Sequence, residues 1–308
     1  MMRGQGRSLS VYIKGGLSVK WIKKYYVPFF MILPAFLLIA FMFFTPIIQT
    51  VYLSFVEWNG IWQTPKEFVG FSNYKRMFSD RVFWICIRNM FIYLAQGVLI
   101  QGPIAFLLAM FISKKIRGLR AFKFAFFLPV IIPMTAVAIM WKFILNPNWG
   151  LINDMIRFFN PDFNMDFLGN PDIAMYSVVL VSAWVYIGLN MVIFSAGMTA
   201  IPEELYESGE LDGATGIKKI LYITLPMMKE SLKVYVILMI TGTLKTFDLV
   251  FVMTKGGPNE ATQVPAVNMY LQTFSYGKFG YGATIATFIL VVGLIGSLIA
   301  NKYLVAKE

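Results

Sequence analysis

Long apolar runs separated by short polar segments are the main pattern along this chain. Crossing the hydrocarbon core of a bilayer takes about 20 residues, and several runs reach that length. The pattern predicts an all-α polytopic membrane protein with residues 27–305 as a single transmembrane domain, an interfacial segment at 1–26 and a tail at 306–308. Its six expected transmembrane helices lie at roughly 27–55, 89–112, 121–145, 173–199, 231–253 and 281–304.

Lysine and arginine are unevenly divided between the two sides that these spans define. The segments 1–26, 113–120, 200–230 and the C-terminal tail together carry 15 of them, whereas the loops of the other side carry 8. Basic residues concentrate on the cytoplasmic side of membrane proteins, so we expect both termini and the 200–230 segment in the cytoplasm. On the other side, the many Asn, Asp, Pro and aromatic residues of 146–172 indicate a structured external cap.

Composition supports this class. Hydrophobic residues make up 58% of the chain and charged residues 14%, with a mean hydropathy of +0.66, whereas about a quarter of the residues in soluble proteins are charged. We therefore expect a multi-pass protein of the cell membrane, in contact with membrane lipids. The net charge of +11 comes from basic residues at the ends of apolar runs, which favours membrane topology over a nucleic-acid partner.

Two residue counts exclude whole classes of chemistry. Histidine is absent, which excludes His-based proton relays, and Cys86 is the only cysteine, which excludes an intrachain disulfide. No metal site and no bound cofactor are expected. The phosphate-binding pattern GxxxxGK[ST] does not occur in the sequence, so we do not expect this chain to bind a nucleotide itself.

The segment 200–230 is the least membrane-like stretch in the second half of the chain. Pro202 and acidic residues after it favour the start of a helix, while Gly213 and Gly216 favour a stop and a bend before a second short helix. This helix–turn–helix is either a solvated connection or a docking element for a cytoplasmic partner. Five of the 16 acidic residues fall within ten positions here: Glu203, Glu204, Glu207, Glu210 and Asp212.

Two motifs carry a family resemblance. Glu207 is followed six residues later by Gly213, then by nine intervening residues and the pattern Ile223-x-Leu225-Pro226. Downstream, FDLVFVMTKGGPNEATQV at 247–264 is similar to an FD…LTGGGP…AT segment that follows the fifth span in the same family. The sequence resembles the permease subunits of bacterial ABC importers, in the maltose-type branch for sugars and oligosaccharides.

The resemblance implies a permease without enzymatic activity that works by alternating access. ATP and Mg would be bound by a separate cytoplasmic ATPase dimer, whose cleft receives the helix at 203–213. The other implied partners are a second permease subunit, in a heterodimer, and an extracytoplasmic solute-binding protein. The residues implied in ATPase coupling are Glu203, Glu204, Tyr206, Glu207, Asp212, Gly213, Ala214, Ile223, Leu225 and Pro226.

The sequence departs from the family pattern at one place in this helix. Ser208 and Gly209 stand where the family has two alanines after the glutamate. Glycine in a helix interior costs about 1 kcal/mol relative to alanine. We therefore expect the insert to be loosely ordered until a partner holds it.

Polar residues within the fourth and fifth spans are candidates for the substrate pathway. Ser182, Tyr186 and Asn190 recur at i, i+4 and i+8 and share one helix face. Trp184 could stack on a sugar ring, with Trp141 as further aromatic surface. Ionisable residues within a span usually face a water-filled path. The fifth span contributes Thr243, Lys245, Thr246 and Asp248.

These residues also have structural interpretations. The α-helical stripe can serve interhelical hydrogen bonds, and Lys245 and Asp248 can form an i, i+3 ion pair or contact a partner subunit. For function, import of a carbohydrate, in particular an oligosaccharide, is the main hypothesis. A polyol, a glycerol phosphate or another small polar solute is the alternative within the family, and an ion-coupled secondary transporter is the alternative of another class.

Overall fold

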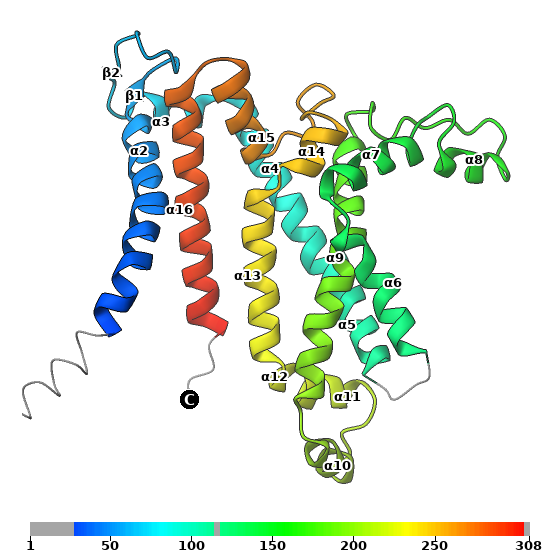
Figure 1. Cartoon of the computed structure of the whole chain (residues 1–308). Coiled ribbons are helices and arrows are strands. Elements are labelled where there is room, and N and C mark those ends of the chain that lie inside the picture. Colours follow the sequence, from blue (N-terminus) through cyan, green and yellow to red (C-terminus); the bar gives the residue numbers. More distant parts are fainter. Residues whose placement is uncertain (1–27, 114–117, 305–308) are drawn as a thin grey trace, which may run out of the picture. The chain divides into compact units, whose positions relative to one another are not determined.

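The structure, a computed structural model, describes residues 28–113 and 118–304 and is mostly helical (Figure 1). The chain divides into two compact units, residues 1–52 and 53–308. In the first unit, the described residues form one helix that begins at Pro28 and includes η1 (Ala40–Phe44) and most of α2 (Thr45–Ser54). Most of its large apolar side chains are exposed, which suits a surface that faces lipid or another subunit.

The second unit contains all the remaining elements. A two-residue antiparallel strand pair, in which Val56 faces Phe68, is the departure from the all-α prediction. In chain order the elements are β1 (Val56–Glu57), β2 (Glu67–Phe68), α3 (Ser72–Ser79), α4 (Arg81–Gln96), η2 (Gly97–Gln101), α5 (Gly102–Ile112), α6 (Leu119–Ile131), α7 (Met134–Ile144), α8 (Leu151–Arg157), α9 (Ala174–Thr199), α10 (Glu203–Leu211), α11 (Ile217–Lys219), η3 (Ile220–Thr224), α12 (Leu225–Met227), α13 (Lys229–Lys245), α14 (Asp248–Met253), α15 (Pro265–Tyr270), η4 (Leu271–Ser275) and α16 (Phe279–Leu304).

Four helices in the described residues are long and apolar enough to cross a membrane, or five if one bent pair counts as a span. They are Pro28–Ser54, Arg81–Ile112, Ala174–Thr199 and Phe279–Lys302. The second of these begins eight residues before the predicted start at 89, because Asp80 caps the helix and its carboxylate accepts from the Val82 amide over 2.9 Å. The six-span arrangement with both termini in the cytoplasm stays a prediction.

The predicted third span is not one straight helix. Residues 121–145 fall into α6 and α7, whose axes are bent by 98° at Ile132 and Pro133. Proline disfavours the α conformation of the residue before it, and Ile132 is accordingly extended, with φ −70° and ψ 135°. A hydropathy average detects no such break because the residues on both sides of the bend are apolar.

The predicted fifth span is also wrong in extent. It was expected over 231–253, but α13 ends at Lys245 and a short separate helix, α14, follows. Thr246 is extended, with φ −60° and ψ 111°. Lys245 and Asp248 are therefore not i, i+3 neighbours on one helix.

Helix α9 lies at the centre of the second unit. It packs against α5, α6 and α13, and buried side chains occur on most of its turns. One apolar cluster gathers around Val178 and Val185 in its first half, and a second gathers around Met191 and Phe194 in its second half. The polar residues predicted for the substrate pathway lie on the segment of α9 where the two clusters meet.

Candidate functional site

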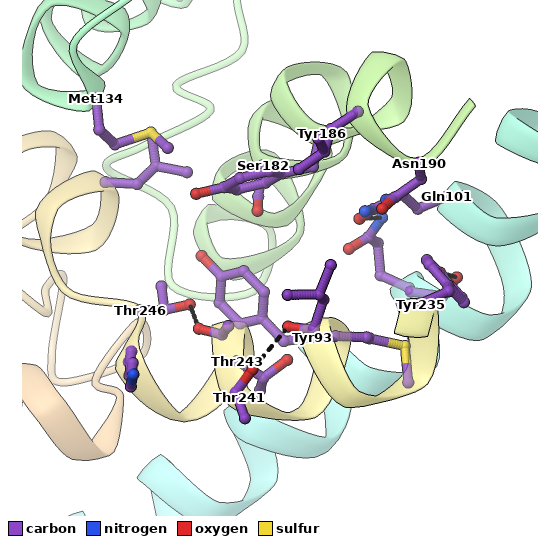
Figure 2. A pocket seen from close by; sticks show the side chains of 18 of the residues that line it. Tyr93, Gln101, Met134, Ser182, Tyr186, Asn190, Tyr235, Thr241, Thr243 and Thr246 are labelled. Carbon is purple, nitrogen blue, oxygen red and sulfur yellow. Dashed lines mark hydrogen bonds between the residues drawn. The ribbon is translucent and has the colours of Figure 1, made fainter. Parts of the chain in front are cut away.

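A cavity of about 360 Å³ lies among α4, η2, α9, α13 and α14 (Figure 2). Volumes of roughly 300–1,000 Å³ are typical of small-molecule sites. Hydroxyl and amide groups line much of it, together with one basic and one acidic side chain. Its polar lining residues are Tyr93, Gln96, Gln101, Ser182, Tyr186, Asn190, Tyr235, Thr241, Thr243, Lys245, Thr246 and Asp248.

The polar stripe of α9 lies on this cavity as the helical spacing predicts. Ser182, Tyr186 and Asn190 all line it, and Figure 2 shows them along one wall. Among the residues that the structure describes, none of the three forms a side-chain hydrogen bond. Their polar groups are therefore available to a ligand or to water rather than joining α9 to a neighbouring helix.

The lining also contains amides that sequence reasoning missed. Gln96 and Gln101 flank the π-helical turn η2, and the Gln96 Nε2 donates to Gln101 Oε1 over 3.1 Å. The hydroxyl of Tyr235 donates to the Gly97 carbonyl over 2.6 Å, which joins this turn to α13. π-Helical turns often occur at functional sites. The sequence signal that would have identified these amides is the presence of two glutamines within an apolar span.

Tyr93 contributes a buried hydroxyl to the cavity. Its side chain is only 4% exposed, and its Oη has no hydrogen-bond partner among the described residues. A buried hydroxyl without a partner is costly. Because Tyr93 lines the cavity, a bound solute or an ordered water can supply the missing partner.

The end of α13 forms a further part of the wall. Thr243, Lys245, Thr246 and Asp248 all line the cavity, as predicted for this segment. The Thr246 hydroxyl donates to the Gly242 carbonyl over 2.9 Å. The ion pair of Lys245 with Asp248, one structural alternative for these residues, is absent from the described residues, whose ion pairs are Asp154–Arg157, Glu210–Lys219 and Glu230–Lys233.

Trp184 is not brought to the cavity. It lies on the same helix as the polar stripe, but its indole meets that of Trp141, with ring centroids 5.5 Å apart and an interplanar angle of 71°. The two rings form an edge-to-face pair outside the cavity lining. The stripe repeats every four residues, and Trp184 falls two residues from its nearest members, which turns it to another side of α9.

The predicted helix–turn–helix is present between α9 and α13. Helix α10 begins after Pro202, with Glu203 and Glu204 in its first turn, where the helix dipole favours acidic side chains. Gly213 follows with φ +81°, a left-handed conformation that suits the predicted stop. Glu207 and Asp212 are exposed on this element, and Figure 1 shows it at one end of the unit.

Contacts join α10 to the helical stretch that leads into α13. Lys219 Nζ lies 2.6 Å from Glu210 Oε1 and 4.7 Å from the centre of the Tyr206 ring. The hydroxyls of Tyr206 and Thr224 are 3.4 Å apart. Ala214, Leu225 and Pro226 lie within the connecting turn and the stretch itself.

Gly209 does not interrupt α10, and the looseness expected of this helix without a partner stays a prediction. Helix α10 continues through Gly209 to Leu211, and a Cβ atom at Gly209 would collide with Cδ1 of Ile223. The absent side chain thus lets Ile223 pack directly on the helix. The close contact offsets part of the helix-propensity cost of about 1 kcal/mol.

The second sequence motif forms α14 and the loop that follows it. Asn89, fully buried in α4, donates from Nδ2 to the carbonyls of Ala261 and Gln263, each over 2.8 Å. Within the loop, the hydroxyls of Thr254 and Thr262 are 2.7 Å apart. Asn89 therefore holds the loop after α14 against α4, although the two segments are distant in sequence.

Within residues 28–113 and 118–304, no group of three or more His, Cys, Asp or Glu side chains is placed to hold a metal ion. The polar cavity and the helix α10 are the two features to which the sequence-predicted site residues lead. One can hold a hydroxylated solute, and the other presents an exposed acidic face.

Comparison with known proteins gives consistent matches. Residues 101–307 match the family described as "Binding-protein-dependent transport system inner membrane component". The "Probable ABC transporter permease protein YurN" of Bacillus subtilis (strain 168) is 33% identical over 280 residues, covering 90% of this chain and 95% of YurN. The "Arabinooligosaccharides transport system permease protein AraP" of the same organism is 31% identical over 281 residues, covering 89% of this chain and 87% of AraP.

A solved structure has the same fold. It is a chain of a bacterial ABC transporter involved in the import of the acidic polysaccharide alginate. The TM-score is 0.80 at 23% sequence identity, and the match covers 94% of this chain and 98% of the other. At this identity the likeness concerns the fold alone.

Proposed function

This chain belongs to the family of binding-protein-dependent transport system inner membrane components, and on that premise we propose that it imports a carbohydrate, in particular an oligosaccharide. It is a permease subunit of an ABC importer and lies in the cell membrane. The observation that carries the substrate proposal is the cavity lined by hydroxyl and amide groups beside α9.

The lining suits a solute with many hydroxyl groups. Ser182, Asn190 and the amides of Gln96 and Gln101 each offer donors and acceptors, and a sugar hydroxyl can use both. The free Oη of Tyr93 adds one more. The relatives support a saccharide, since AraP is named for arabinooligosaccharides.

The charges of the cavity favour a neutral solute. Lys245 and Asp248 contribute opposite charges to the same wall, so the lining has little net charge with which to attract an anion such as a glycerol phosphate. A neutral polyol fits the same chemistry but makes fewer hydrogen bonds than an oligosaccharide. We therefore retain the carbohydrate as the substrate class.

Energy input is assigned to a separate ATPase dimer, which binds ATP and Mg. The exposed helix α10, with Glu207 and Gly213, docks in a cleft of that dimer. Closure of the dimer pulls α10, and the contacts of Lys219 and Ile223 pass the motion to α13, which carries one wall of the cavity. The spans then rock between inward-facing and outward-facing packings.

Two further partners complete the importer. A second permease subunit, in a heterodimer, covers the open side of the cavity, where Lys245 and Asp248 are exposed in the isolated chain. An extracytoplasmic solute-binding protein delivers the substrate to the end of the bundle opposite α10. The family description itself names dependence on a binding protein.

The docking of α10 can be tested by placing an asparagine at either of two nearby positions. Asparagine adopts positive φ more readily than other non-glycine residues, and nothing lies within 4 Å of a Cβ atom at Gly213. Gly213→Asn should therefore fold but obstruct the ATPase. Thr215→Asn places the same side chain at an exposed position two residues away and serves as the matched control.

Both variants are coexpressed with the ATPase and second permease, and purified with the solute-binding protein added. We expect Gly213→Asn to lose ATPase copurification or the stimulation of ATP hydrolysis by loaded binding protein, while Thr215→Asn retains both. If Gly213→Asn retains full copurification and full stimulation, α10 is a solvated connection and the coupling proposal is wrong.

A further inference from the structure

The segment between α7 and α9 contains a short helix, α8, whose polar side is turned inward. Asn153 is fully buried and donates to the carbonyls of Asn146 and Met165 over 3.2 and 3.0 Å. The Arg157 guanidinium donates to the carbonyls of Asn148 and Phe163, each over 3.1 Å. These bonds fold the segment around the polar side of α8 and fix how the helix is rotated.

The opposite side of α8 is apolar and exposed. Leu151, Met155, Phe158 and Phe159 are between 53% and 86% exposed. At about 100° per residue they fall within roughly 100° of the helix circumference. The helical turn continues past Arg157, because the amide of Phe158 donates to the Asp154 carbonyl over 3.2 Å. The result is a preformed apolar stripe that no described residue covers.

Exposed aromatic side chains also lie where α7 leads into α8. The 98° bend turns the chain sideways where α6 ends, and α8 follows α7 before the chain returns through α9. Phe143, exposed at the end of α7, and Trp149, just before α8, have ring centroids 5.4 Å apart. Figure 1 shows α8 running across the direction of α9, at the end of the unit opposite α10.

We propose that α8 lies in the bilayer interface, with its apolar stripe inserted into the leaflet on the side opposite α10. Aromatic residues concentrate at this depth in membrane proteins, and amphipathic helices bury their apolar face at the boundary of headgroups and acyl chains. The four residues of the stripe carry no charge and no hydrogen-bonding group, which suits hydrocarbon better than a partner with a polar rim. The inference uses the membrane location of the chain and is independent of the transported solute.

The proposal can be tested with spin labels on neighbouring positions. Met155→Cys and Phe158→Cys place the label on the stripe, and Asp154→Cys places it on the flank. Met155 and the Asp154 side chain are each 57% exposed, so the pair is matched in exposure and differs in direction. Cys86 is buried, and a labelled sample of the unsubstituted chain measures any background. Arg157 retains its backbone acceptors when Asp154 is replaced.

The labelled chains are assembled with the ATPase and second permease in lipid nanodiscs, and power saturation measures collisions with oxygen and with a water-soluble nickel chelate. We expect oxygen to exceed the chelate at 155 and 158 and the order to reverse at 154. Chelate exceeding oxygen at 155 and 158 would place the stripe in water. Exclusion of both reagents with an immobilised spectrum would mean that a protein subunit covers it. Either result overturns the proposal, whereas a failure to transport carbohydrate leaves it unaffected.

Discussion

Asn89→Leu is the substitution that most directly tests how the loop after α14 is held. Leucine has the same branched arrangement of side-chain heavy atoms as asparagine but has no donor. The change removes both Nδ2 hydrogen bonds, to Ala261 and to Gln263, each 2.8 Å long in the structure. Asn89 is 0% exposed, so water cannot easily replace it, and two loop carbonyls lose their donors inside the protein.

The expected magnitude follows from those two bonds. Each net hydrogen bond contributes about 0.5–1.5 kcal/mol, and each buried group left without a partner costs about 1–3 kcal/mol. The gain from a buried leucine offsets part of this. We therefore expect a loss of roughly 2–4 kcal/mol in the free energy of local opening of residues 254–263, which corresponds to about 30-fold to nearly 1,000-fold more frequent opening.

Amide hydrogen exchange of the full chain, measured by mass spectrometry, reports this opening directly. Peptides that cover 254–263 should exchange faster by that factor in Asn89→Leu, while peptides of α9 stay unchanged. Thr287→Val is the control, because the Thr287 hydroxyl donates over 2.8 Å to the Ala283 carbonyl within its own helix. Exchange of 254–263 within a factor of about three of the parent rate would refute the assigned role of Asn89.

Three further predictions concern the cavity and α10. Asn190→Leu should lower substrate uptake about 10-fold or more, since one or two hydrogen bonds to the solute are lost. Uptake into proteoliposomes tests this, with Trp184→Leu on the same helix as the control. An equal loss of uptake in both variants would contradict the cavity assignment. Glu210→Gln removes an exposed ion pair with Lys219 and should change the free energy of unfolding by no more than about 1 kcal/mol; a thermal shift that is larger and insensitive to salt would be inconsistent. Gly209→Leu should overpack the contact with Ile223 and lower the free energy of local opening of α10 by about 1–3 kcal/mol. Amide hydrogen exchange of α10 measures this change. Adding Ile223→Ala should restore protection, whereas no restoration would show that the side chain at 223 is not the obstacle.

The local chemistry of the sequence predicted α10 and its turn well. Proline, first-turn acids and a glycine at the helix end act through neighbouring backbone groups, so their effects are readable without knowledge of tertiary packing. The spacing of Ser182, Tyr186 and Asn190 likewise predicts a shared face, because α9 is one regular helix. Both features lie where the sequence placed them.

The errors arise where tertiary structure overrides a hydropathy average. The bend at Pro133 and the end of α13 at Lys245 interrupt apolar runs that look continuous. Gln96 and Gln101 were missed because two amides hardly change the hydropathy of a long apolar span. Helix propensity alone does not predict the contact of Gly209 with Ile223, because that contact depends on a residue from another helix.

The central claim, that this permease imports a carbohydrate at the expense of ATP, is tested most directly by uptake into proteoliposomes. The assembled complex is reconstituted with its solute-binding protein outside, and a panel of labelled oligosaccharides, polyols and glycerol phosphate is offered. The account predicts oligosaccharide uptake that requires ATP on the ATPase side and persists when a protonophore abolishes the proton gradient. Uptake that continues without ATP and stops with the protonophore would contradict it and favour an ion-coupled transporter.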